Sequence, residues 1–352
     1  MVLTFRYRLK GTSAAKRLSR MAVAVNGVWN FCGGIQNDSR RLNRRWPSGF
    51  DLIGLTNGCT KELGLHSDTV QAVCKQFATS RDKAKRRPRW RVSFGAKRSL
   101  GWVPFQCARP VKVSGDTVIF LGRKYRLWLS RPIPADIRSG GFSQDADGRW
   151  FLNLVCEVAG DLPAGVGEVG IDLGLKDLAA LSTGEKIENP RHLRRSAAKL
   201  ARTQRAGRKR LARKIHRKVA AQRRHFLHEQ STRIVRANAL ICVGDVNSAA
   251  LARTRMAKSV LDAGWSAFRS MLQYKTAMRP GARFVETNER HSTQTCSVCF
   301  ARSGPSGLKG LRVRSWVCDG CGTLHDRDTN SGQNILRSGR STALQTTEIP
   351  VL

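Results

Sequence analysis

The sequence predicts an α+β protein of several domains, because three kinds of pattern follow one another along its 352 residues. A strand-like run at residues 1–10 leads into helical periodicity over 11–93. Short alternating runs, which are typical of strands, fill 94–162. Strands and helices then alternate, and two pairs of cysteines interrupt this last region. A chain of this length has room for one large domain or two to three small ones.

The charge of the chain indicates a polyanionic partner. Lys and Arg number 63 against 25 Asp and Glu, which gives a formal net charge of +38. Such an excess repels itself in a compact state, so nucleic acid is the favoured partner. A ribosomal or histone-like structural protein is the alternative. An acidic membrane is disfavoured because the cations are spread along the chain, and the N-terminus has no long apolar run that would form a signal peptide or a membrane span.

Four of the ten cysteines have the spacing of a metal site. They form two C-x-x-C pairs separated by a polar insert, which predicts a tetrahedral zinc ribbon formed by Cys296, Cys299, Cys318 and Cys321. The other six are scattered without pairing logic and are best explained as reduced, buried thiols: Cys32, Cys59, Cys74, Cys107, Cys156 and Cys242.

The first half of the chain predicts a small barrel beside a helical block. Residues Val2 to Leu9 alternate as a strand, and a helix over 68–84 has Ser67 as its expected N-cap. Ser114 to Asp116 is the expected turn of a hairpin, and the acidic segment Ser143 to Arg149 is another. Several short twisted strands beside helices suggest a barrel of the kind often used on nucleic acid.

An aspartate on a buried strand gives the clearest sign of catalysis. Val169 to Leu173 predicts a strand with Asp172 near its end, and Leu178 to Ser182 returns as a second strand. This is the opening of a ribonuclease H-like fold, in which carboxylates from separate strands and a helix bind two divalent ions. The alternative is that Asp172 only caps a turn.

A long basic helical pair follows over 190–236. Its apolar stripe is narrow, so we expect these helices to protrude from the domain or to lie across it. A solvated coiled coil is the alternative, but the near absence of acidic residues favours contact with phosphates.

Taken together, these motifs resemble the transposon-encoded TnpB family of RNA-guided DNA endonucleases, which is related to type V CRISPR effectors. The resemblance rests on VLTFRYRL, AVNGVWNFC, GIDLGLKDLAAL and CDGCGTLHDRDTNSGQNIL, in this order. It implies the following domains: a wedge-like β-barrel at 1–10 and 94–162, a helical recognition domain at 11–93, a RuvC-like nuclease at 163–289 and 325–340, and a zinc ribbon that binds target nucleic acid at 290–324. Residues 341–352 are expected to form a disordered tail.

The resemblance also implies the catalytic carboxylates. Asp172 matches the first of them and Asp328 matches the last, while Asp326 would orient or cap. The family usually has a glutamate in a strand that reads like IVIEDLN. Here the run is ICVGDVN, so Gly244 occupies the place of the glutamate. Asp245 cannot simply substitute, because successive side chains of a strand point to opposite faces.

Glu289 offers a replacement for the missing glutamate. It lies just past a neighbouring strand, where relatives commonly carry a proline before their cysteine motif. The sequence therefore predicts a relocated site of Asp172, Glu289 and Asp328, which would bind Mg²⁺ or Mn²⁺ while the thiolates bind Zn²⁺. The alternative is that Glu289 is a surface residue and the nuclease is inactive.

The function that this resemblance implies is RNA-guided cleavage of duplex DNA next to a short flanking motif, by two-metal-ion hydrolysis. The partners would be a guide RNA and a double-stranded DNA target, in the prokaryotic cytoplasm and on the nucleoid when bound to DNA. One alternative is a nuclease-inactive RNA-guided repressor. A DDE-type transposase fits less well, because the order of the carboxylates and the inserted ribbon favour the nuclease.

Overall fold

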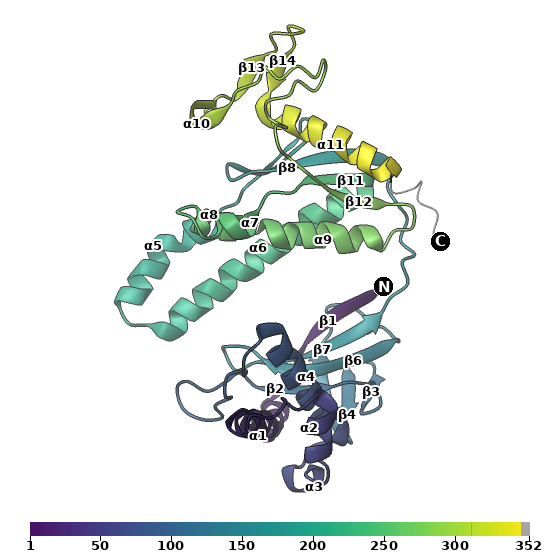
Figure 1. Ribbon diagram of the computed structural model, residues 1–352, viewed down its shortest axis with the longest axis vertical. Helices are drawn as coiled ribbons and strands as arrows, with labels where there is room; N and C mark the ends of the chain where they lie inside the picture. The colour runs from purple at the N-terminus through teal and green to yellow at the C-terminus, as the bar shows by residue number, and fades with distance from the viewer. Residues whose placement is uncertain (311, 346–352) are drawn as a thin grey trace. The chain divides into compact units, whose positions relative to one another are not determined.

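The computed structural model describes residues 1–310 and 312–345, and the chain forms two compact units. Unit 1 comprises residues 1–158 and unit 2 comprises residues 159–352. Figure 1 shows their elements.

Unit 1 contains a seven-stranded antiparallel sheet with the order β2-β6-β7-β1-β5-β4-β3. The predicted first strand is confirmed with the same bounds. The strands are β1 (Val2–Leu9), β2 (Trp102–Phe105), β3 (Val111–Ser114), β4 (Thr117–Phe120), β5 (Arg123–Trp128), β6 (Ile137–Gln144) and β7 (Trp150–Glu157).

The sheet of unit 1 curls around an aromatic core without closing into a full barrel. The rings of Phe105 on β2 and Phe120 on β4 lie 5.8 Å apart, although β6, β7, β1 and β5 separate these strands in the sheet. Phe142 contacts both rings. In the described part of the chain, however, no backbone pairing joins the edge strands β2 and β3. The predicted barrel is therefore a half-open one.

Four helices complete unit 1, namely α1 (Thr12–Arg41), α2 (Gly49–Leu55), α3 (Thr60–Leu63) and α4 (Ser67–Ala84). Buried side chains of α1 and α4, such as Leu18 and Phe77, belong to the same apolar core as the sheet. The prediction that Ser67 is the N-cap of α4 is wrong by one residue. The Nδ1 atom of His66 accepts the hydrogen bond from the Asp68 amide instead, at 3.2 Å.

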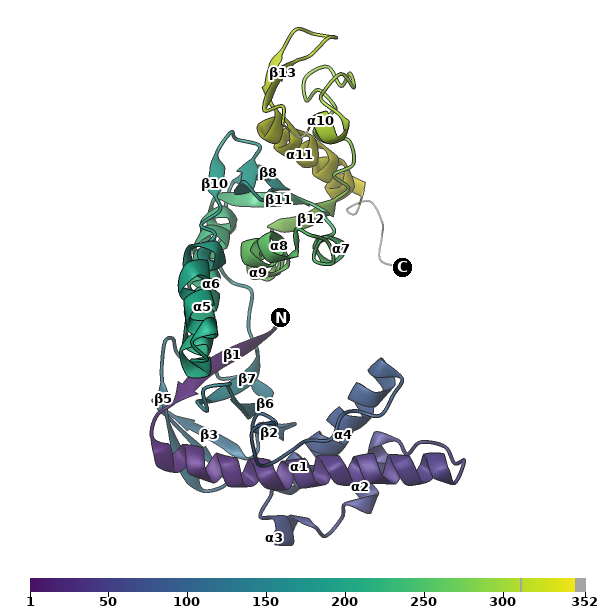
Figure 2. The ribbon, with the colours of Figure 1, turned by 90° about the vertical axis from the view of Figure 1, so that its left-hand side faces the viewer.

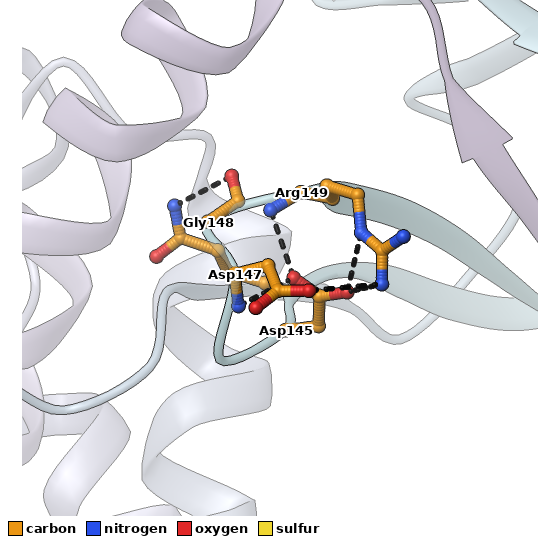
Figure 3. Close-up of polar contacts among 5 residues, drawn as sticks. Asp145, Asp147, Gly148 and Arg149 are labelled. Atoms are coloured by element: carbon orange, nitrogen blue, oxygen red, sulfur yellow. Dashed lines mark hydrogen bonds and ion pairs between the residues drawn. The ribbon is translucent and has the colours of Figure 1, made fainter. Parts of the chain in front are cut away.

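The predicted acidic turn between β6 and β7 is a hairpin held by one carboxylate, as Figure 3 shows. Asp145 accepts hydrogen bonds from the backbone amides of Asp147 and Arg149, and its second oxygen accepts from the Arg149 guanidinium. The acidic side chains of this segment therefore bind groups within the hairpin, as expected for a turn rather than a metal site.

Unit 2 contains a five-stranded mixed sheet with the order β10-β9-β8-β11-β12. The first three strands in sequence, β8, β9 and β10, pair antiparallel, whereas β11 and β12 lie parallel to β8. This arrangement matches the ribonuclease H-like fold that the strand of Asp172 predicts. The strands are β8 (Gly167–Leu173), β9 (Asp177–Leu181), β10 (Lys186–Glu188), β11 (Asn238–Gly244) and β12 (Arg283–Thr287).

Helices cover both faces of this sheet. Figure 1 shows α11 (Arg327–Gln345) on one face and α6 (Lys209–Ala237) and α9 (Trp265–Ala277) on the other. The helix α5 (His192–Arg205) pairs with α6, and Figure 2 shows this predicted basic hairpin extending from the sheet. The short helices are α7 (Ser248–Leu251) and α8 (Ala257–Ala263). The sequence of 259–278 predicts a single helix. The structure has α8 followed by α9 instead, because Gly264 takes a left-handed conformation with φ +74°.

Glycines let α11 lie directly on the sheet. A Cβ atom at Gly170 of β8 would meet the carbonyl oxygen of Gly332 at 2.0 Å, and one at Gly339 would meet the Cys242 Sγ atom at 2.1 Å. The alternation of β8 then sends Asp172, two residues after Gly170, toward the same helix. Ile171, which lies between these two residues, points to the opposite face of the sheet and is buried in the core with side chains of α6 and α9.

The predicted zinc ribbon leaves the sheet after β12 and returns at α11. It contains α10 (Gly307–Gly310), β13 (Ser315–Val317) and β14 (Leu324–Asp326), of which the two strands pair antiparallel.

The helix α11 continues through part of the segment that was expected to be a disordered tail. Residues 341–345 are helical because Ala343 is buried beside Leu240 and Cys242, and because the Arg283 guanidinium donates to the Ala343 carbonyl oxygen. The remainder of the tail, 346–352, lies outside the described residues.

Among the six cysteines outside the ribbon, four are buried as expected, while Cys59 and Cys107 are only half-buried. Within residues 1–310 and 312–345, no helix combines the length and the apolar composition that crossing a bilayer requires.

A buried lysine joins α9 to α6. The Lys275 ammonium donates at 2.7 Å to the His228 carbonyl oxygen and to the hydroxyls of Ser231 and Thr232. Burial lowers the pKa of Lys275 to about 8, and the charges of Arg279 and Arg236 act in the same direction.

Replacing Gly170 with alanine should destabilise unit 2, because the new methyl group would collide with backbone atoms of α11 that have no rotamer to change. We expect a loss of at least about 1–3 kcal/mol, as for other overpacked sites. Thermal unfolding measures it. The control is Gly27→Ala, since a Cβ there on α1 meets no atom within 4 Å. Equal melting temperatures for Gly170→Ala and wild type would contradict this packing.

The free energy of unfolding should rise between pH 8 and pH 10.5 through Lys275. In that range the folded state has released the lysine proton while the unfolded chain, in which lysine has its ordinary pKa of 10.5, still holds it. The gain is up to about 3 kcal/mol. Urea unfolding at pH 7.5 and 9.5 should show this rise in wild type and a smaller one in Lys275→Met. The same pH dependence in both proteins would contradict it.

Candidate active site

The three predicted carboxylates line one cavity of about 520 Å³ in unit 2. Asp172 comes from β8, Glu289 from the loop after β12, and Asp328 from the first turn of α11. Each is only partly exposed to solvent. The fold therefore brings together the three side chains that the sequence singles out.

Glu289 fills the space that a side chain at position 244 would occupy. A Cβ atom built on Gly244 would lie 2.5 Å from the Glu289 Oε2 atom and 3.3 Å from its Cβ atom. Val243 pairs with Ile171 in the parallel ladder, so Gly244 and Asp172 are the next residues along neighbouring strands. The carboxylate of Glu289 thus lies beside Asp172, on the face of the sheet where the absent glutamate would project.

The carboxylates interact electrostatically. Burial raises the pKa of Asp172 to about 7, and the charges of Glu289 and Asp328 act in the same direction, against a hydrogen bond from the Ser331 hydroxyl. Burial also raises the pKa of Glu289, and the charge of Asp245 raises it further. The positive charge of Arg269 acts in the opposite direction. Like charges that share a partly buried cavity favour a bound cation.

Asp328 and Asp326 have different surroundings, although they are two residues apart. Asp328 lines the cavity and lies 3.4 Å from the Arg314 guanidinium. Asp326 accepts a hydrogen bond from the Thr329 amide at the start of α11 and forms an ion pair with Lys186 at 2.7 Å. It is therefore a helix cap.

Asp245 is exposed and is not among the residues that line the cavity. Its carboxylate accepts a hydrogen bond from the Glu289 amide at 3.2 Å, so it helps to fix the loop that carries Glu289. Sequence reasoning rejected Asp245 as a ligand but missed this positioning role. It also missed the basic residues of the cavity wall, Lys176, Arg314 and Arg327. No local spacing marks them, because they come from the turn after β8, the residue before β13 and the start of α11.

The four cysteines form a compact tetrad. Their Sγ atoms all lie within 4.8 Å of one another. The separations are 3.7 Å between Cys296 and Cys321 and 3.5 Å between Cys299 and Cys318. Four sulfurs at about 2.3 Å from one tetrahedral zinc ion would lie about 3.8 Å apart, so the tetrad fits Zn²⁺. In the described part of the chain the carboxylates do not converge on one point in this way.

Two asparagines of α11 hold the start of the ribbon. The side-chain amides of Asn330 and Asn334 both donate to the carbonyl oxygens of Ser292 and Thr295. The hydroxyls of Ser292 and Ser331 lie 2.8 Å apart. The segment between Glu289 and the first zinc ligand is thereby fastened to the helix that carries Asp328.

Comparison with known proteins assigns the two halves of unit 2. A family model described as "Probable transposase" matches residues 155–255, and the "Cas12f1-like, TNB domain" model matches residues 265–335. A protein of Streptomyces pristinaespiralis named "Putative RNA-guided DNA endonuclease" is 40% identical over 226 residues. The Escherichia coli protein "Putative RNA-guided DNA endonuclease InsQ" is 26% identical over 242 residues.

Those alignments cover 60% of this chain in both cases, and they cover 55% and 59% of the two relatives. The chain thus spans little more than half the length of the relatives that it matches. A solved Cas12f1–sgRNA–target DNA complex covers 96% of this chain and 99% of its own at 14% identity, but the TM-score is 0.38 and carries no conclusion.

Unit 2 has the architecture of a ribonuclease H-like domain with an inserted four-cysteine ribbon. The two family models fall on that sheet and that ribbon. These matches agree with the resemblance to the TnpB family that the motifs of the chain predict.

Removal of the tetrad should unfold the ribbon, because a structural zinc contributes its binding free energy to folding. We expect Cys318→Ser to lose bound zinc and to expose the ribbon to protease, whereas Cys59→Ser, which changes a half-buried thiol far along the chain, should keep both properties. Elemental analysis and limited proteolysis measure the two effects. Full zinc content in Cys318→Ser would contradict the assignment.

Proposed function

We propose that this protein is an RNA-guided endonuclease that cleaves duplex DNA next to a short flanking motif. Its active site would consist of Asp172, Glu289 and Asp328, with Mg²⁺ or Mn²⁺ as the cofactor. The observation that carries the proposal is the position of the Glu289 carboxylate in the space above Gly244, beside Asp172. A surface glutamate without function would have no reason to occupy a gap left by a glycine on the active face of the sheet.

The donor set suits hard divalent cations. Three carboxylates from separate elements provide oxygen ligands without nitrogen or sulfur, which Mg²⁺ and Mn²⁺ prefer. When bound, such ions lower the pKa of water and neutralise charge on the oxygens of a phosphodiester.

The chain itself contributes orientation and positive charge. The Ser331 hydroxyl and the Glu289–Asp245 hydrogen bond fix two of the carboxylates. The Trp265 indole donates to the Gly174 carbonyl oxygen at 3.2 Å and steadies the turn after β8. Lys176, Arg314 and Arg327 line the same cavity and can attract the phosphate to be cut.

The proposed partners are a guide RNA and a double-stranded DNA target, in a prokaryotic cytoplasm. The net charge of +38 and the names of the relatives support them. The guide would read the sequence by base pairing, while the protein holds the backbone and reads the flanking motif. Within this assignment, residues 1–10 and 94–162 would be the wedge-like barrel and 11–93 the recognition domain. Residues 163–289 and 325–340 would be the RuvC-like nuclease, with 290–324 as the target-binding ribbon.

The relocated carboxylate can be tested by moving it back. The protein is purified with its co-expressed RNA and given Mg²⁺ and a plasmid library with a randomised flank. We expect Glu289→Ala to cut about 100-fold more slowly or worse, because a metal ligand is lost. The double variant Gly244→Glu with Glu289→Ala should recover part of the activity, since the new side chain projects from β11 into the vacated space. Rates come from sequencing of the cut ends over time.

Three variants make the result specific. Asp172→Ala and Asp328→Ala should be as inactive as Glu289→Ala. Glu286→Ala, which removes an exposed glutamate on β12, the strand before Glu289, should cut like wild type. Full activity in Glu289→Ala would show that relocation is wrong. A wild type that binds the target without cutting it would favour an RNA-guided repressor, and DNA strand transfer would favour a transposase.

A further inference from the structure

A second cavity adjoins the candidate active site. It measures about 510 Å³ and shares Leu175 and Lys176 with the cavity of the carboxylates. Leu175, Lys176, Arg191, Leu193, Arg194 and Lys258 are the lining residues that matter here, and we name this cavity the α5 groove. It therefore leads from the turn after β8 to the first turns of α5 and to α8.

The α5 groove is basic. Four cations line it, and Lys176, Arg194 and Lys258 are exposed. Within residues 1–310 and 312–345, no carboxylate lies within 4.0 Å of these three side chains. Asp262 is the acidic residue among those that line the groove. Both of its oxygens accept from the Leu193 amide at 3.0 Å, and it lies 3.7 Å from the Arg223 guanidinium. Its charge is thus already compensated.

A third cavity nearby is less suitable than the α5 groove for binding a phosphate backbone. It measures about 480 Å³ and also contains Lys176, Arg191 and Arg194, but Asp177 and Glu188 line it as well. In the described part of the chain these two carboxylates have no ion pair within 4.0 Å. The negative charges of Asp177 and Glu188 would repel a phosphate in the third cavity. The α5 groove, which Lys258 lines, does not contain these two carboxylates.

The walls of the groove are held in place by hydrogen bonds. The Asn189 side chain donates to the Leu175 carbonyl oxygen at 3.1 Å and accepts from the Arg191 amide at 3.1 Å. The Arg191 guanidinium donates to the Lys176 carbonyl oxygen at 3.4 Å. The turn after β8 and the start of α5 are therefore one connected wall, so the backbone that carries Lys176, Arg191 and Arg194 is held in place beside the strand of Asp172.

We propose that the α5 groove binds the phosphodiester backbone of the DNA strand being cut, on one side of the scissile phosphate. Lys176 stands where the groove meets the carboxylates, and Arg194 and Lys258 receive the phosphates that follow. Leu175 and Leu193 give the sugars an apolar floor. The groove thereby fixes which strand polarity enters the site. This assignment rests on the proposed nuclease function and adds the binding site that orients its substrate.

Neutral phosphate linkages test the groove position by position. The complex with co-purified RNA is given target duplexes in which one strand carries a single uncharged methylphosphonate at successive linkages. We expect wild type to cut about tenfold more slowly when the neutral linkage lies within a few nucleotides of the cut on one side only, since a charge-assisted contact is lost. The double variant Arg194→Gln, Lys258→Gln should be slower on normal DNA and should lose its sensitivity at those linkages, except at the one nearest the cut, which Lys176 still contacts.

Arg202→Gln is the matched control, because Arg202 lies on α5 outside both cavities. It should keep the wild-type pattern of sensitive linkages whatever its overall rate. The proposal is overturned if the double variant remains as sensitive as wild type at the linkages beyond the one nearest the cut, or if neutral linkages slow wild type equally on both sides of the cut.

A chemical footprint judges the groove without any cleavage. In Asp172→Ala protein with its RNA, addition of target DNA should protect the amines of Lys176 and Lys258 from acetylation, as measured by mass spectrometry. Protection by the RNA alone would assign the groove to the guide and overturn the proposal, as would no protection at all. If wild-type protein leaves unmodified target DNA uncut, the proposed nuclease function is refuted. The footprint would still show whether target DNA binds in the α5 groove.

Discussion

The contact between α11 and the sheet is the constraint on which unit 2 depends. It is made where the backbone of Gly170 meets the backbone of Gly332, and where Gly339 leaves room for the Cys242 side chain. This close approach sets the height of α11 above β8, and hence the distance from Asp328 to Asp172. The same helix holds the start of the ribbon through Asn330 and Asn334. One packing contact therefore positions the last carboxylate directly and the Glu289 loop indirectly.

The ribbon shares this dependence because it is inserted between two residues of the candidate site. Its first segment follows Glu289 and its last strand, β14, ends at Asp326, the cap of α11. A zinc ion that holds the tetrad would keep both ends of the insert close together. The metal that folds the ribbon and the carboxylates of the cavity are thus mechanically linked, although they need different ligands.

Local patterns in the sequence were sufficient for much of this arrangement. Alternation identified the strands of Asp172 and Val2, and cysteine spacing identified the tetrad. The alternation of side chains along a strand correctly predicted that Asp245 does not line the cavity. The sequence did not reveal the break at Gly264, because a glycine in a helical pattern is often tolerated. It also made residues 341–345 look like a tail, because the burial of Ala343 depends on β11, a hundred residues earlier. The proximity of Lys176, Arg194 and Lys258 could not be predicted for the same reason: the turn after β8 and the helices α5 and α8 bring these residues together in the fold.

The exclusion between a side chain at position 244 and the Glu289 carboxylate has an evolutionary consequence. A chain with glutamates at both positions would place two acids in one volume, and a chain with neither would lack a carboxylate beside Asp172. A change from a glutamate at 244 to a glutamate at 289 needs two substitutions. Whichever comes first, the intermediate protein has either both acids or none at this place. The two positions should vary as a pair among homologues, and the glycine at 244 is then as much a mark of the proposed relocated site as the glutamate itself.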